Sequence, residues 1–152
     1  QLSKLFVDEI QPKTTGDNIS FTGTPLTPTR PAFYINGTTF DGSTDRFIGG
    51  TTAVTLNVGN HLNESTGVFT APISGVYHVN FTLVTSDTKS HFIDLLKNGA
   101  TVFGHNLSYG QANQTGSMTV NTALAVGDTM EARRRGSSYG VYNAHFSGFL
   151  IG

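Results

Sequence analysis

The sequence contains no cysteine and few charged residues. Without cysteine, the 152-residue chain has no disulfide, no thiolate metal site and no cysteine nucleophile. Asp, Glu, Lys and Arg together make up only 12% of the residues, and the formal net charge is −1. A general nucleic-acid-binding protein needs a basic stripe to displace counterions from phosphates, so we expect no nucleic-acid partner. Hydroxyl and amide groups must dominate the surface, and these suit subunit contacts and neutral ligands such as sugars.

Long apolar segments and helical periodicity are also missing. No apolar stretch approaches the roughly 20 residues that span a bilayer, so we expect no membrane insertion. Gly, Thr, Asn and Ser are abundant instead, and no long run has its apolar residues at helical spacing. Short strands joined by many turns are typical of such a composition. The chain is therefore predicted to be an all-β protein, and it is long enough to bury a core.

The clearest predicted strand covers residues 76–83. Alternate residues from Tyr77 to Leu83 are apolar and the residues between them are mostly polar, which is typical of a strand with one face on a core. The dipeptide Asn98-Gly99 predicts a two-residue hairpin turn, because both residues readily adopt positive φ. In all, strands are expected near residues 32–35, 47–48, 54–58, 67–71, 76–85, 91–96, 101–107, 117–124, 129–134 and 145–151.

A proline-rich stretch separates an N-terminal segment from the rest of the chain. Pro25, Pro28 and Pro31 forbid a helix and disfavour an inner strand. We therefore predict an extended neck or attachment segment over residues 1–29 and a head domain over residues 30–152. The neck has too few apolar residues to bury them alone, so we expect it to pack against other chains.

Four short phrases follow one another in the head, and each resembles a strand meeting a turn. They are Gly67-Val68-Phe69-Thr70-Ala71-Pro72 with Gly75-Val76-Tyr77, then Lys97-Asn98-Gly99, then Gly127-Asp128, and finally Phe146-Ser147-Gly148-Phe149-Leu150. In this order they resemble the globular head of complement C1q and the wider tumour necrosis factor superfamily. The resemblance spans residues 31–152 and implies a ten-stranded jelly-roll sandwich that assembles as a trimer. The aromatic residue that usually follows two positions after Tyr77 is Val79 here, and we expect Phe81, on the same face, to supply the missing ring.

The resemblance also implies a homotrimer whose axis is lined by aromatic side chains. The candidate interface residues are Phe33, Tyr77, Phe81 and Phe149 in the head, with Leu5, Val7 and Ile10 in the neck.

Residues 5–19 resemble the trunk segments of trimeric fibre and spike proteins of tailed bacteriophages. Together with the absence of cysteine and of a collagen tripeptide repeat, this favours a virion protein: a fibre, spike or decoration head located on the particle. Such a protein would attach to other virion proteins through the neck and bind a host-surface glycan or protein receptor. The alternative is a secreted, extracellular animal lectin of the C1q type for pattern recognition. The sequence contains six Asn-X-Ser/Thr sequons. In a secreted animal lectin several of them would be glycosylated, whereas in a phage protein they would be accidents of composition, and we prefer the second interpretation.

Two loops, residues 108–116 and 136–143, carry aromatic rings and amides that suit sugars. The candidate ligand-binding residues are Tyr109, Gln111, Asn113, Tyr139 and Tyr142, with Arg133 and Arg135 nearby. The other interpretation is structural: the tyrosines pack at a subunit rim, and the arginines form a solvated rim or an ion pair between subunits. In a strand, Arg134 would face away from the other two arginines.

Catalysis has little support in the sequence, and we expect no catalytic residues. The five histidines lie in no phrase typical of a catalytic triad, and their spacing does not predict a metal site. We expect no cofactor, with calcium left open because Asp17, Asp41, Asp45 and Asp87 lie in Gly/Ser/Thr-rich loops.

Overall fold

The computed structural model describes residues 30–50, 54–107, 112–135 and 140–151, and these residues form strands joined by turns. Each of the ten expected strand ranges overlaps one of the twelve observed strands, and the two short strands β2 and β5 were not predicted. The strands are β1 (Ala32–Gly37), β2 (Thr39–Phe40), β3 (Phe47–Gly49), β4 (Val54–Val58), β5 (Leu62–Asn63), β6 (Val68–Thr70), β7 (Gly75–Thr85), β8 (His91–Lys97), β9 (Ala100–Leu107), β10 (Thr115–Leu124), β11 (Thr129–Arg135) and β12 (Val141–Leu150).

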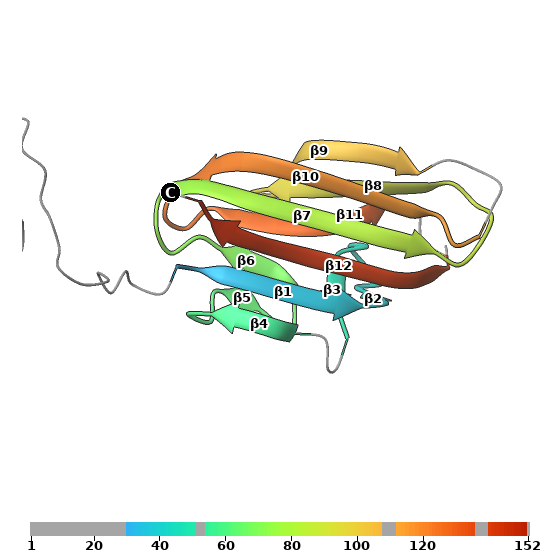
Figure 1. Cartoon of the computed structure of the whole chain (residues 1–152), viewed down its shortest axis with the longest axis horizontal. Helices are drawn as coiled ribbons and strands as arrows, with labels where there is room; N and C mark the ends of the chain where they lie inside the picture. Colours follow the sequence, from blue (N-terminus) through green and yellow to red (C-terminus); the bar gives the residue numbers. More distant parts are fainter. Residues whose placement is uncertain (1–29, 51–53, 108–111, 136–139, 152) are drawn as a thin grey trace, which may run out of the picture.

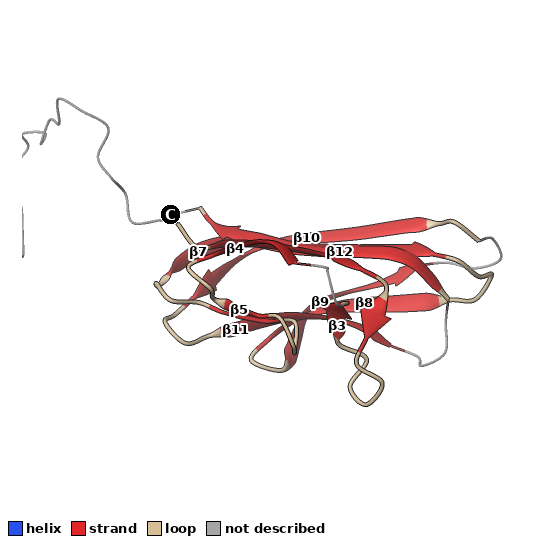
Figure 2. Cartoon of the chain, turned by 90° about the horizontal axis from the view of Figure 1, so that it is seen from below, coloured by secondary structure: helices blue, strands red, loops and turns tan. Residues whose placement is uncertain are grey.

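Two five-stranded sheets face each other and form a sandwich (Figure 2). The strand order is β10-β7-β12-β1-β4 in the first sheet and β5-β6-β11-β8-β9 in the second. The strands pair antiparallel throughout, and β2 and β3 form a separate small hairpin (Figure 1). The expected all-β, ten-stranded sandwich is confirmed.

The core lies between the sheets and is rich in aromatic rings. Alternation along β7 places Tyr77, Val79, Phe81 and Leu83 in the core, where each is fully buried. The ring of Phe81 lies 5.6 Å from that of Phe47 and 6.4 Å from that of Phe146. Phe81 therefore supplies an aromatic ring to the core beside Val79, as expected, and Phe47 brings the β2–β3 hairpin onto the same cluster.

The turn between β8 and β9 has the predicted geometry. Asn98 and Gly99 have φ angles of 50° and 77°, and Lys97 pairs with Ala100 across the turn. Both central residues are thus left-handed, as a two-residue hairpin requires.

The two ends of the sandwich differ. Arg30 donates from Nη1 to the carbonyl of Ile151 (2.9 Å), and Leu150 donates its N–H to the carbonyl of Pro31 (3.1 Å), so the chain enters and leaves the described domain at one end. We call this end the base. The opposite end, called the loop end, carries the segments that follow β7 and precede β10 and β12 (Figure 1). In the described part of the chain, no helix is long and apolar enough to cross a membrane.

Candidate functional site

Three chain segments are joined by hydrogen bonds at the loop end. Asn113 donates its backbone N–H to the carbonyl of Thr85 (2.8 Å), and Thr85 donates to the carbonyl of Gln114 (2.9 Å). The buried Thr85 hydroxyl accepts the N–H of Gln114 as well (3.1 Å). Ser86 donates its N–H to the carbonyl of Gly140 (2.9 Å). The start of the 86–90 loop is therefore bonded both to the segment before β10 and to the residue before β12.

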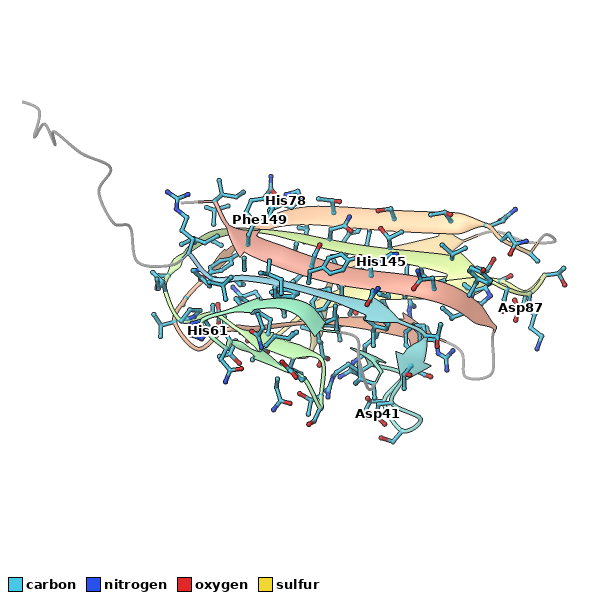
Figure 3. All side chains as sticks on the ribbon, turned by 60° about the horizontal axis from the view of Figure 1, so that its bottom comes forward. Asp41, His61, His78, Asp87, His145 and Phe149 are labelled. Atoms are coloured by element: carbon cyan, nitrogen blue, oxygen red, sulfur yellow. The ribbon has the colours of Figure 1, made fainter. Side chains whose placement is uncertain are left out.

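Asp87 strengthens this junction and was not predicted to have this role. Its Oδ1 lies 2.7 Å from Nε2 of the buried His91 and also accepts the N–H of Lys89, while Oδ2 accepts the N–H of Gly140 at 2.6 Å. The hydrogen bond from His91, followed by that from Gly140, lowers the pKa of the Asp87 carboxyl to about 2. One carboxylate at the loop end thus holds β8 and the beginning of β12 together (Figure 3).

Two of the predicted ligand residues lie at this end with accessible side chains. Asn113 is exposed at a φ of 63°, and Tyr142 is 71% exposed at a bulge in β12. Tyr109, Gln111 and Tyr139 lie outside the described residues.

The predicted ligand arginines take part in ion pairs within the chain. Arg133 Nη2 lies 2.5 Å from the buried carboxylate of Glu131, which also pairs with Arg46. Arg135 contacts both oxygens of the buried Asp94, at 2.6 and 3.0 Å. These arginines cover buried carboxylates on the outer face of the second sheet.

Arg134 points to the opposite face of β11, as predicted from strand alternation. It contacts Asp45 at 3.3 Å, and its guanidinium group lies 4.4 Å from the centre of the Phe40 ring.

In the described strands, the outer face of the first sheet carries no formal charge from Asp, Glu, Lys or Arg. Residues directly opposite each other in an antiparallel pair share a face, so the pairing register assigns each outward position. These positions are Val76, His78, Asn80, Thr82 and Val84 on β7; Thr115, Ser117, Thr119, Asn121 and Ala123 on β10; Asn143, His145, Ser147 and Phe149 on β12; Ala32, Tyr34 and Asn36 on β1; and Leu56 and Val58 on β4. We call this surface the uncharged face.

The predicted interface residues divide between this face and the core. Phe149 is 48% exposed on the uncharged face, with its ring 5.1 Å from that of His78 (Figure 3). Phe33, Tyr77 and Phe81 are 2%, 0% and 0% exposed, so the structure contradicts their placement at an interface. Their side chains point toward the second sheet, and the Tyr77 hydroxyl donates to the carbonyl of Ile73 (2.7 Å). Leu5, Val7 and Ile10 lie outside the described residues.

A network of neutral polar groups runs along the uncharged face. Asn80 donates from Nδ2 to Thr119 Oγ1 (2.8 Å), and Thr82 shares a hydrogen bond with Ser117 (2.8 Å). His78 Nδ1 lies 2.9 Å from Asn121 Oδ1. These bonds connect β7 to β10 through side chains in addition to the backbone ladder.

A shallow groove of about 500 Å³ lies at the base. Its walls come from the start of β7 and the end of β10, and its rim carries the ion pair of Lys97 with Asp128 (2.9 Å). Hydrogen bonds from Asn98 and Lys97 lower the pKa of Asp128 well below its usual range. The carboxylate stabilises the β8–β9 and β10–β11 turns rather than remaining available to a ligand.

With the sandwich and its surfaces defined, comparison with known proteins identifies the family. A family model described as the C1q domain matches residues 32–151. The chain belongs to the C1q domain family. Its sequence is 33% identical over 104 residues to the human and mouse proteins called complement C1q tumor necrosis factor-related protein 3, a match that covers 65% of this chain and 42% of each relative. The chain therefore spans less than half the length of these curated relatives.

Solved structures support the same jelly-roll fold for the C1q domain described here. The globular domain of zebrafish complement 1qA protein gives a TM-score of 0.60 at 17% identity, covering 81% of this chain and 98% of that one. Murine APRIL, crystallised at pH 5.0, gives a TM-score of 0.67 at 11% identity, covering 80% of this chain and 99% of that one. The predicted C1q and tumour necrosis factor resemblance is confirmed.

The comparisons overturn the prediction of a virion protein. The curated relatives are animal proteins, so the predicted phage fibre or spike function is wrong. The location on a virion and the attachment to other virion proteins through the neck are not supported. The resemblance of residues 5–19 to phage trunk segments is not supported. The prediction of a phage protein depended on one short segment, residues 5–19, whose residue types occur in many proteins, whereas the match to the C1q domain covers residues 32–151.

No group of three or more His, Asp or Glu residues that could hold a metal ion occurs among the residues that the structure describes. Asp41, one of the calcium candidates, accepts hydrogen bonds from the Ser43 backbone (2.9 Å), the Ser43 hydroxyl (2.8 Å) and the Thr44 hydroxyl (2.9 Å). These bonds lower the pKa of Asp41 to about 2, and the carboxylate caps the β2–β3 turn. Asp45 contacts Arg134, and Asp17 lies outside the described residues.

Proposed function

We propose that this C1q domain is a non-enzymatic recognition module that assembles as a homotrimer and binds a glycan or protein surface with its loop end. The uncharged face is the observation that carries the proposal. Charged residues are depleted in the cores of protein–protein interfaces, and an outer sheet face without any Asp, Glu, Lys or Arg fits that pattern. A secreted, extracellular setting belongs to the same proposal and is supported by the animal C1q-related proteins.

A closed ring of three identical chains brings two different surfaces of each chain together. The uncharged face supplies one of them. The second is edge strand β9, where Val102 and Phe103 are 41% and 44% exposed and the outer backbone edge has no neighbouring strand in the sheet. In the trimer, the β9 edge of one chain packs against the uncharged face of the next.

A ring with one threefold axis directs the three loop ends to the same side. Each loop end offers the exposed Tyr142 ring and the Asn113 side chain, and the hydrogen bonds of Asp87 and Thr85 hold the loops that carry them. Aromatic rings cover the apolar C–H patches of sugars, while amides bind hydroxyls. Three such sites on one particle bind a repetitive surface more tightly than one site does. Tyr109, Gln111 and Tyr139 belong to the same proposed site.

The ion pairs argue for a structural role of the arginines. Because Arg133 and Arg135 already neutralise Glu131 and Asp94, an acidic sugar would have to compete with buried carboxylates for them. We therefore place the arginines at the margin of the proposed site.

Light scattering of the full chain at micromolar concentration tests the assembly. We expect three times the 16.2 kDa chain mass. Ser147→Glu places a charge in the middle of the uncharged face and should give monomers, whereas Thr70→Glu, at an exposed position on β6, should remain trimeric. A monodisperse monomer for the unmodified chain would refute the trimer.

Binding to a glycan array and to whole cells tests recognition. Tyr142→Ala should reduce binding while the trimer mass stays the same. Val126→Ala serves as the control, because Val126 is 67% exposed at the other end of the sandwich. Unchanged binding by an intact Tyr142→Ala trimer would remove this residue from the site.

A further inference from the structure

His145 lies near the middle of the uncharged face and makes two side-chain contacts through its ring nitrogens (Figure 3). Its Nδ1 lies 2.6 Å from the Tyr34 hydroxyl, and its Nε2 lies 3.3 Å from Nδ2 of Asn143. The rings of Tyr34 and His145 stack with their centres 5.7 Å apart. The imidazole is half-buried before any partner chain is considered.

The orientation of Asn143 determines which ring nitrogen carries the proton. Asn143 Oδ1 accepts the N–H of Ala144 at 2.9 Å, so the amide turns its NH₂ group toward His145. Nε2 must then accept a hydrogen bond and carry no proton, while Nδ1–H donates to the Tyr34 oxygen. This arrangement fits neutral histidine alone.

Acid would disrupt the arrangement. A proton added at Nε2 faces the N–H of Asn143, so an acceptor becomes a second donor and the hydrogen bond is lost. Among the residues that the structure describes, no carboxylate contacts His145 to stabilise the imidazolium. Of the titratable groups described, Tyr34 on β1 contacts His145, Thr82 faces it from β7, and His78 is the other titratable side chain among the outward positions.

We propose that His145 makes the trimer acid-sensitive, an inference that rests on the proposed assembly through the uncharged face. The β9 edge of the neighbouring chain offers no compensating anion, since residues 100–107 include no Asp or Glu, and the titratable residue in this strand is His105. Protonation would place three imidazolium groups in three buried, uncharged interfaces, which is unfavourable without a paired anion. The trimer therefore releases folded monomers in mild acid.

The number of protons taken up on dissociation determines how steeply the dissociation constant of the trimer depends on pH. Each chain takes up one proton at His145 when the trimer dissociates, and histidine changes charge between about pH 5 and 8. With three protons per trimer, the dissociation constant of the trimer rises about 1000-fold for each unit of pH decrease over the range in which dissociation takes up these protons.

Analytical ultracentrifugation of the full chain from pH 7.5 to 5.5 measures this constant, with circular dichroism at each pH to follow the fold. We expect trimers at pH 7.5 and folded monomers at pH 5.5. His145→Gln, which cannot be protonated, should remain trimeric across the range. His61→Gln is the matched control, because His61 lies beside Gly59 in the turn between β4 and β5 and is not among the outward positions of the uncharged face, so this variant should dissociate like the unmodified chain.

The other outcomes are distinguishable. A trimer that persists at pH 5.5 overturns the acid sensitivity and leaves the proposed function intact, whereas a monomer at pH 7.5 overturns both. Equal acid dissociation of the His145→Gln variant assigns the effect elsewhere and overturns the role of His145, as does loss of the β signal together with the trimer. Nitrogen-15 NMR of the unmodified trimer checks the ring directly even if the variant fails to fold: a proton on Nε2 at pH 7.5 contradicts the proposal.

Discussion

The Asp87 carboxylate and the buried His91 imidazole lie 2.7 Å apart, and the same carboxylate receives the N–H of Gly140 from the loop before β12. Through these contacts Asp87 joins the start of β8, in the second sheet, to the residue before β12, in the first sheet. If the loop end binds a ligand as proposed, a side chain that holds two of its loops in place contributes to binding without itself contacting the ligand.

Replacing Asp87 with Asn should loosen the loop end. The pKa of this carboxyl is lowered from 3.8 to about 2, so the ionised form stabilises the native loops above about pH 4 and that stabilisation is lost as the pH falls toward 2. In NMR experiments, the Gly140 amide of the unmodified chain should therefore shift between pH 4 and 2, and in Asp87→Asn it should show the acid position already at neutral pH. Asp41→Asn changes an equally acidic carboxyl in the β2–β3 hairpin and should leave Gly140 unaffected. An unaltered Gly140 signal in Asp87→Asn would contradict the role given to this residue.

Phe81 and Phe149 should respond differently to truncation. Phe81→Ala leaves a cavity among buried rings and should lower the free energy of unfolding by about 3–5 kcal/mol at any protein concentration. Phe149→Ala removes an exposed ring from the uncharged face and should instead raise the concentration at which trimers form. Urea unfolding at several concentrations separates the two effects. A concentration-independent loss of stability in both variants would place Phe149 in a purely structural role.

Sequence patterning predicted the sandwich because its main signals are local. Alternation along residues 76–83 and the Asn98-Gly99 turn depend on neighbouring residues alone, and both appear in the structure as expected. The strands β2 and β5 have two residues each, which is too short for a periodic signal. The first residues of β12, 141–144, were missed because Tyr142 forms a bulge that interrupts alternation.

The candidate site was harder to predict, because its contacts join distant parts of the sequence. Alternation showed that Tyr77 and Phe81 share a face of β7, but it did not tell whether that face meets the second sheet or lies on the outer surface. The residues between them, His78 and Asn80, lie on the outer surface, where we propose the contact with another chain. The ion pair of Arg135 with Asp94 spans 41 positions, so no local pattern could have revealed it.

Two glycines with positive φ should differ in their tolerance of a side chain. A Cβ on Gly67 would lie 2.0 Å from the carbonyl oxygen of Phe47, whereas a Cβ on Gly99 meets nothing within 4 Å. Gly99→Ala should cost only the left-handed backbone strain, about 1–2 kcal/mol. Gly67→Ala must also displace the backbone of β3, so we expect a loss of at least about 3 kcal/mol. Thermal unfolding of the two variants measures both losses of stability. Equal losses would refute the close approach of the turn at Gly67 to β3.

Deleting residues 1–29 should leave a folded head. The buried hydrophobic cluster of the described chain runs from Phe33 to Phe146, and the proposed division of the chain at residues 29 and 30 places all of it in the head. Circular dichroism of the truncated chain should retain the β signal. Loss of that signal would show that the two parts fold as one unit.

The sequons should divide by position if the chain passes through the secretory pathway of animal cells. Asn63 is exposed at the end of β5, where its Oδ1 accepts the N–H groups of Ser65 (3.0 Å) and Thr66 (3.1 Å). Asn80 instead uses Nδ2, the atom to which a glycan is attached, to bond β10 on the uncharged face. A glycan there would remove these bonds and block the proposed interface. We therefore expect peptide mass spectrometry of secreted trimers to find a glycan on Asn63 and none on Asn80. The variant Ser65→Ala should remove the Asn63 glycan and leave the trimer intact, and an Asn80 glycan in an intact trimer would exclude this part of the sheet from the proposed interface.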